Sequence, residues 1–207
     1  KNQYKPKLTK MKKIFSICLV IIAVVALSVS CKDPEPPANV VGDVISIDGQ
    51  KGVVFSVDAD GEHGLMVCLD ESVCCWSKNH VTTGATNRED GQKNFDVISS
   101  LGNWRLDYPV FNVAYTQGEG WYIPAKDELQ KLLESALTIN PLIEQQGGTP
   151  LSTIKTYWSS TEDSHESAYS AQVDENGTVT WPINLKNNTV NLTARPVKKF
   201  YNPRVVE

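Results

Sequence analysis

The chain has 207 residues, of which 41% are hydrophobic and 21% charged, with a formal net charge of −4 at pH 7. All 24 acidic residues but only 14 of the 20 basic ones follow residue 30, so the segment 31–207 carries a formal charge of −10. A body this acidic repels phosphate backbones and anionic lipid surfaces, so we expect no nucleic-acid partner.

The first 30 residues are typical of a secretory signal peptide with a short upstream segment. Met11 is the expected start, Lys12 and Lys13 form the positive region, and Ser28–Ser30 lead into Cys31. The apolar run between them has about 14 residues, fewer than the ~20 that span a bilayer. Cys31 is the expected lipidation site, because its thiol can take a thioether-linked diacylglycerol. The alternative is an ordinary secreted protein with a chance Cys at this position.

We expect three parts: residues 1–30, a Pro-rich tether at 31–40, and one domain at 41–207. A triacylated Cys31 would anchor the chain stably to a membrane. The Ser-Val-Ser-Cys ending and the nearby acids Asp33 and Glu35 resemble those of Bacteroidetes surface lipoproteins. The expected location is therefore the outer membrane, with the domain exposed at the cell surface.

Residues 41–69 predict a β-meander, because β-rich runs at 44–48, 52–58 and 63–70 are separated by Gly-containing turns. The turn at 58–63 holds three acids and His63, but it lacks the further acidic positions of a calcium loop. We expect a solvated turn there and no metal.

Three cysteines fall inside the domain, namely Cys68, Cys74 and Cys75. We expect structural thiols, either buried or partly bridged, and a bridge from Cys68 to one of the other two stays open. A zinc site is disfavoured because the nearest histidine, His80, has no paired motif.

The middle of the chain predicts helices after a polar loop at 81–92. Four residues recur at helical spacing, namely Asn94, Phe95, Ile98 and Leu101, and Pro109 can begin a second helix that reaches Gln117. The clearest helix is at 120–137, and Asn140–Pro141 opens a short further one.

The last third predicts strands at 156–161, 168–174, 178–185 and 191–200. Strands, then helices, then strands predict an α+β fold with two antiparallel β regions and intervening helices.

Three stretches carry a resemblance to a known family, namely GWYIPAKDELQKLL (120–133), YWSST (157–161) and TARPV (193–197). They are similar to the motifs of the Lcl-type C-terminal domain family, which is named for a collagen-like bacterial adhesin and is common in surface lipoproteins of gut Bacteroidetes. The resemblance spans about 52–197 and implies a C-type-lectin-like domain used in adhesion. Ala125 stands where the family has a helix-capping Thr, a change that costs about 1 kcal/mol.

The stretch TYWSSTED (156–163) also raises a hydrolase reading, which would need a serine on a sharp turn and a histidine base. No Gly-x-Ser-x-Gly elbow is present. We expect Trp158 in the core and the hydroxyls of Ser159, Ser160 and Thr161 on backbone groups. A formylglycine-generating oxidase would need two late cysteines, and none follows Cys75. We therefore expect no enzyme and no cofactor.

The polar loop that follows Trp158 is the best candidate for a binding site, and a solvated hairpin connection is its alternative. A second polar segment, 184–191, is expected beside it. The predicted ligand-binding residues are Glu162, Asp163, His165, Glu166, Tyr169, Asn184, Asn187 and Asn188. The function that follows is a surface-anchored lipoprotein whose non-catalytic module binds a glycan or a protein. The alternative is a structural subunit of a surface fibre or envelope complex.

Overall fold

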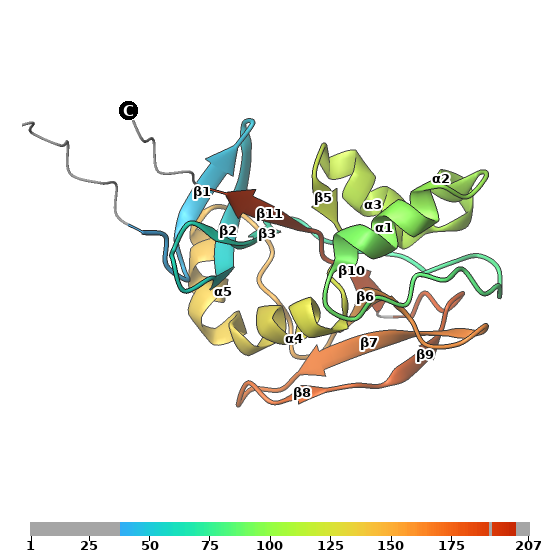
Figure 1. Ribbon diagram of the computed structural model, residues 1–207. Helices are drawn as coiled ribbons and strands as arrows, with labels where there is room; N and C mark the ends of the chain where they lie inside the picture. The colour runs from blue at the N-terminus through green and yellow to red at the C-terminus, as the bar shows by residue number, and fades with distance from the viewer. Residues whose placement is uncertain (1–37, 191, 202–207) are drawn as a thin grey trace, which may run out of the picture. The chain divides into compact units, whose positions relative to one another are not determined.

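The computed structural model describes residues 38–190 and 192–201, so the predicted signal peptide, Cys31 and most of the tether lie outside it. The described strands form two sheets (Figure 1). Within this part of the chain, no helix is both long and apolar enough to cross a membrane.

The first sheet has the strand order β1-β2-β3-β11-β5, and its neighbours are antiparallel. Asp48 and Gly49 join the first two strands with φ of 53° and 79°, the left-handed pair that a tight hairpin turn requires. The predicted meander is confirmed in its three strands. The five strands are β1 (Val44–Ile47), β2 (Gln50–Val57), β3 (His63–Cys68), β5 (Trp121–Tyr122) and β11 (Val197–Tyr201).

The second sheet has the order β4-β10-β6-β7-β8, and β9 also pairs with β7. The β10–β6 pair is parallel, whereas the other pairs are antiparallel. The strands are β4 (Ser72–Val73), β6 (Thr156–Glu162), β7 (Ser167–Val173), β8 (Val179–Thr180), β9 (Ile183–Leu185) and β10 (Leu192–Ala194).

The helices of the described chain are short. The group α1–α3 lies on one side in Figure 1, away from α5. Pro109 is at the first position of α3, as predicted, where its missing N–H costs nothing. The helices are α1 (Gly91–Ser99), α2 (Trp104–Asp107), α3 (Pro109–Gln117), α4 (Lys126–Glu134) and α5 (Ala136–Gln145).

The start of α4 shows how a missing cap is compensated. Ala125 has no side-chain acceptor, but Glu128 Oε2 accepts the N–H of Ala125 at 2.8 Å and that of Gly91 at 2.9 Å. The hydroxyl of Tyr122 donates to the other oxygen at 2.8 Å. Burial of Glu128 raises the pKa of its carboxyl. One buried carboxyl therefore joins the starts of α1 and α4 to β5.

Trp158 is fully buried, as predicted, and the core also includes Leu133, fully buried, and Trp121, which is 3% exposed. Leu133 packs with α5 and the first sheet, whereas Trp158 packs with α1 and α3. The indole N–H of Trp158 donates to the carbonyl of Cys74 at 2.9 Å, so its polar atom is satisfied inside the core.

The expected α+β, C-type-lectin-like class is wrong, because the framework is a mainly β fold of two sheets with few, short helices. Several predicted elements also differ, among them the strand expected at 178–185, which is divided into β8 and β9. The helix expected at 120–137 begins at Lys126, since Trp121 and Tyr122 pair with β11 as a strand. The strand expected at 191–200 is split at Arg195–Pro196 into β10 and β11, which belong to different sheets.

Candidate functional site

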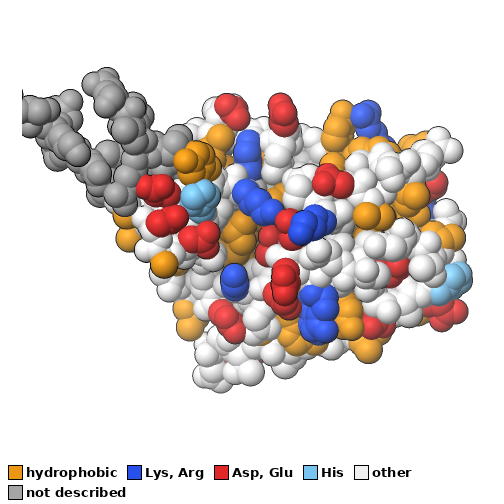
Figure 2. All heavy atoms as spheres, in the orientation of Figure 1, with side chains coloured by type: hydrophobic (Ala, Val, Ile, Leu, Met, Phe, Trp, Pro, Cys, Tyr) orange, Lys and Arg blue, Asp and Glu red, His pale blue; other side chains and the backbone are white. Residues whose placement is uncertain are grey.

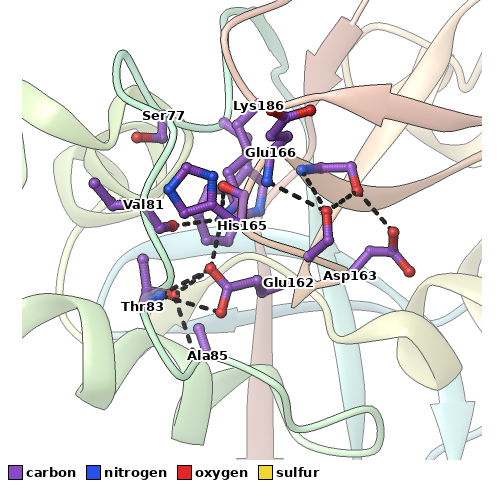
Figure 3. Close-up of polar contacts among 12 residues, drawn as sticks. Ser77, Val81, Thr83, Ala85, Glu162, Asp163, His165, Glu166 and Lys186 are labelled. Carbon is purple, nitrogen blue, oxygen red and sulfur yellow. Dashed lines mark hydrogen bonds and ion pairs between the residues drawn. The ribbon is translucent and has the colours of Figure 1, made fainter.

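The predicted binding loop begins with a buried ion pair. Glu162 is the last residue of β6, a strand whose seven residues are all buried. Lys186 directly follows β9 and is fully buried. Its Nζ lies 2.5 Å from Oε1 of Glu162 (Figure 3). The first residue of the polar stretch is therefore turned into the protein.

The oxygens of the Glu162 carboxylate accept hydrogen bonds from a second segment of the chain. The N–H of Thr83 donates to both oxygens, at 2.8 and 3.1 Å, and the N–H of Gly84 donates at 3.0 Å. The N–H of Glu162 itself donates to the carbonyl of Ala85 at 2.8 Å. A buried carboxylate is stable only when its acceptors are occupied in this way. Glu162 thus holds the 83–85 segment against β6.

The Lys186 ammonium has two further partners. It donates to the carbonyl of Val81 at 2.7 Å and to that of His165 at 3.1 Å. The ring of Trp76 lies 5.0 Å from the same nitrogen. The pair therefore joins three chain segments, 81–85, 162–165 and 186, none of which is adjacent in sequence to another.

The rest of the loop is a tight turn with exposed side chains. The N–H of Asp163 donates to the carbonyl of Ser167 at 3.0 Å, and the Ser167 hydroxyl donates to Asp163 Oδ2 at 2.7 Å. Ser164 and Ser167 share a further hydroxyl bond at 2.7 Å. Asp163, His165 and Glu166 are exposed, so of the predicted acids and histidine only Glu162 is withdrawn from solvent.

Tyr169 lies beside this turn and is partly exposed. A hydrogen bond to the Asp163 carboxylate raises the pKa of the Tyr169 hydroxyl. Lys126 Nζ lies 4.2 Å from the centroid of the Tyr169 ring, and Arg88 lies 5.8 Å from it. Two cationic side chains from other parts of the chain therefore lie next to the predicted loop.

The second polar segment does lie next to the first. The N–H of Lys186 donates to the carbonyl of Glu166 at 2.9 Å, and β9 pairs with the start of β7. Asn184 Nδ2 donates to Ser170 Oγ at 2.9 Å, and Asn188 Nδ2 approaches Asn184 Oδ1 at 3.4 Å. Asn187 is exposed. Ligand binding by these residues stays a prediction.

The hydroxyls of TYWSSTED have structural partners. Ser159 Oγ donates to the carbonyl of Tyr169 at 3.0 Å, and Thr161 Oγ1 donates to that of Asn87 at 2.8 Å. Ser160 Oγ accepts from Asn94 at 3.0 Å, a side-chain contact rather than the expected backbone one. All three residues are buried, so their hydroxyls serve the packing of β6.

The structure also describes the three cysteines of the domain and the acidic turn at 58–63. Cys68, Cys74 and Cys75 are free, and burial raises the pKa of the Cys68 and Cys74 thiols to about 12. In the β2–β3 turn, ligand atoms of Asp60, Glu62 and His63 lie within 4.8 Å of one another. Asp60 is already engaged there, since it accepts from the N–H of Glu62 at 2.8 Å and contacts His63 Nδ1 at 3.1 Å.

Sequence reasoning missed Lys186 and the loop at 81–85 as partners of Glu162. A polar run such as EDSHES indicates solvent exposure for all its members, and nothing local marks the Lys of NLKNN as buried. Only the pairing of β9 with β7 brings Lys186 to Glu162.

On the face shown in Figure 2, acidic and basic side chains are interspersed. The acidic surplus therefore does not form one continuous field on this face.

No protein-family model matches the chain, and no curated protein matches it. Among solved structures, the chain is similar to a fimbrial protein from Bacteroides ovatus ATCC 8483, with a TM-score of 0.55 and 16% sequence identity. The match covers 82% of this chain and 46% of that one, so the chain spans about half the length of the matched structure. The likeness concerns the fold alone, and it does not support the lectin-like fold that was expected. The resemblance to the Lcl-type family stays a prediction.

Proposed function

We propose that the chain is a non-catalytic structural subunit of a surface fibre. The observation that carries this proposal is the fold, which is similar over 82% of the chain to that of a protein described as fimbrial. This function is the alternative that the sequence left open. The predicted lipid anchor at Cys31 is compatible with it, because a subunit held at the outer membrane can form the base of a fibre.

A second observation supports contacts with neighbouring subunits. Strand β9 pairs with β7 on one side, and its Ile183 and Leu185 are 67% and 49% exposed. The only charged residue between 179 and 190 is Lys186, which is buried in the ion pair. Soluble proteins usually protect strand edges with exposed charge. An uncharged edge with two exposed aliphatic side chains is suited to packing against the next subunit.

The test is to locate the chain on the cells that make it. Antibodies raised against it, visualised with gold in the electron microscope, should label filaments along their length or at their base. Filaments sheared from the surface should contain the chain, and a strain without its gene should lose that label. A membrane-bound chain that labels no filament in any growth condition would contradict the proposal.

A further inference from the structure

A cavity lies on a different part of the fold from the predicted loop. It has a volume of about 580 Å³, which falls in the range of small-molecule sites, ~300–1,000 Å³. It lies where α1, the end of α3 and the start of β5 meet. Its lining consists of Gln92, Phe95, Tyr115, Thr116, Gly118, Glu119, Gly120 and Trp121.

The aromatic part of the lining is held in place by other rings. The centroids of Phe95 and Tyr115 lie 5.5 and 5.4 Å from that of Trp104, both in edge-to-face geometry. The Arg105 guanidinium lies 4.1 Å from the Tyr115 centroid and donates to its hydroxyl at 2.7 Å. Tyr115 is nevertheless 43% exposed. An aromatic ring that is fixed and still accessible can pack against the apolar C–H face of a sugar ring.

The polar part of the lining offers hydrogen-bond acceptors. Among the described residues, the Glu119 carboxylate has no hydrogen-bond or ion-pair partner. The Thr116 hydroxyl donates to the carbonyl of Val113 at 2.8 Å, which leaves its lone pairs free to accept. Gln92 uses its amide N–H on Asp96 at 2.9 Å. The complementary ligand therefore carries several donors, as a polyol does.

Charges of both signs lie in or next to the cavity, so neither an anion nor a cation is favoured overall. Glu119 lines it and repels sulfate or carboxylate groups, and no Lys or Arg is among the lining residues. Two cations lie next to the lining, since the Arg105 guanidinium lies 4.1 Å from the Tyr115 centroid and Lys198 Nζ donates to the Glu119 carbonyl at 2.8 Å. A cationic ligand would meet both of them. A neutral, hydroxyl-rich ligand avoids both penalties.

The loop at 118–120 forms one wall of the cavity and is held in place by its glycine geometry and by hydrogen bonds. Gly118 and Gly120 have φ of 120° and 78°, which favour glycine, and a Cβ at Gly118 would lie 1.8 Å from Gln50 Nε2. Gln50 Oε1 accepts from Trp121 Nε1 at 2.6 Å and from Lys198 Nζ at 3.1 Å. A wall already fixed by such bonds loses little entropy when a ligand binds.

We propose that this cavity binds an uncharged sugar unit of a glycan, with its ring on Tyr115 and its hydroxyls on Glu119, Thr116 and Gln92. This binding site is independent of fibre formation, so the two proposals can fail separately.

The probe is an array of neutral, sulfated and sialylated glycans, incubated with the purified 207-residue chain. A polyoxyethylene detergent is used, because a glycosidic detergent would compete for the site. The expected result is binding confined to neutral glycans, followed by calorimetric measurement of Kd for the best of them. Absence of neutral binders at about 10 mM, a concentration at which even very weak ligands register, would overturn the proposal, as would tighter binding of sulfated glycans.

Variants then place the ligand. Tyr115→Ala should weaken the Kd for the best glycan by about tenfold or more, and Glu119→Gln by severalfold. Tyr201→Ala is the matched control, because Tyr201 is 59% exposed and does not line the cavity. Thermal unfolding of each variant guards against loss of fold, and Glu119→Gln keeps the test valid if Tyr115→Ala unfolds. An unchanged Kd in the folded variants, or a loss of binding only in His165→Ala, would overturn the assignment to this cavity.

Discussion

The Lys186 ammonium lies 2.5 Å from the Glu162 carboxylate, and neither side chain is more than 3% exposed. Removing one partner leaves the other charge buried and uncompensated, so Lys186→Met or Glu162→Gln should destabilise the chain by about 3–5 kcal/mol. Urea denaturation monitored by tryptophan fluorescence measures this loss.

An exposed ion pair on the same protein provides the matched control. Lys199 lies 2.8 Å from Asp90, but its side chain is 50% exposed. Lys199→Met should cost less than about 1 kcal/mol, because water screens the pair. Equal losses in Lys199→Met and Lys186→Met would show that burial does not set the strength of the Glu162 pair.

Trp158→Ala should destabilise the chain by about 3–5 kcal/mol, since a fully buried side chain is replaced by a cavity. Ile154→Ala is the comparison, because Ile154 is 79% exposed, and its loss should be within about 0.5 kcal/mol. Equilibrium unfolding in guanidinium chloride measures both. A loss of only a few tenths in Trp158→Ala would place that indole at the surface.

The buried carboxyl of Glu128 predicts a pH dependence of stability. Burial raises its pKa above the ordinary value of 4.5, so the folded chain holds this proton more tightly than the unfolded chain does. The contribution of Glu128 to stability should therefore fall as pH rises from about 4.5 towards the higher folded pKa. Glu128→Gln has no such proton, so its free energy of unfolding should rise relative to that of the wild type over that interval.

The measurement is the free energy of unfolding of both chains at a series of pH values. Glu144→Gln is the control, because Glu144 is exposed on α5. A constant difference between Glu128→Gln and the wild type across the interval would show that the Glu128 proton is not linked to folding.

Within the described part of the chain β9 pairs with β7 alone, so charges placed at its exposed edge should impair assembly. Ile183→Lys and Leu185→Lys place a charge on the exposed aliphatic side chains, so filaments should incorporate less of each variant. Because both positions are exposed, the monomer should lose no more than about 0.5 kcal/mol. Immunoblots of sheared filaments measure incorporation, and Asn176→Lys, at an exposed turn position of the same sheet, is the control. Normal incorporation of both edge variants would remove β9 from the subunit contact.

Cys31 lies outside the described residues, and its lipidation is still testable. Cys31→Ala should release the chain from the membrane fraction and abolish incorporation of labelled fatty acid. Cys18→Ala should change neither, because Cys18 lies in the apolar run expected to be removed. A Cys31→Ala chain that stays membrane-bound and lipid-labelled would refute the anchor.

The local sequence pattern was enough to predict elements whose interacting residues are close together in the sequence. The β2–β3 hairpin and the Pro109 start of α3 depend on alternation and on a fixed φ, both visible in the sequence. Pro141 was less informative, because it lies inside α5 instead of opening a helix. The helix begins at Ala136 and continues through Pro141, so the residues before Pro141 determine where the helix starts.

The remaining errors come from partners distant in the chain. The strand predicted at 191–200 is interrupted at Arg195–Pro196, because the residues before and after this point pair in different sheets. The cavity could not be predicted for the same reason, since its lining comes from three elements that sequence spacing does not relate. The fold class failed for the same reason, because the order of elements does not reveal which strands pair.

Residues 192–201 occupy interior places in both sheets, with β10 between β4 and β6 and β11 between β3 and β5. Val197 pairs with Val67, which lies 130 positions earlier. A nascent chain that has not yet reached residue 192 cannot close either sheet, and such distant pairings form slowly. Because β10 and β11 follow one another in the chain, both sheets are expected to close at the same late stage of folding.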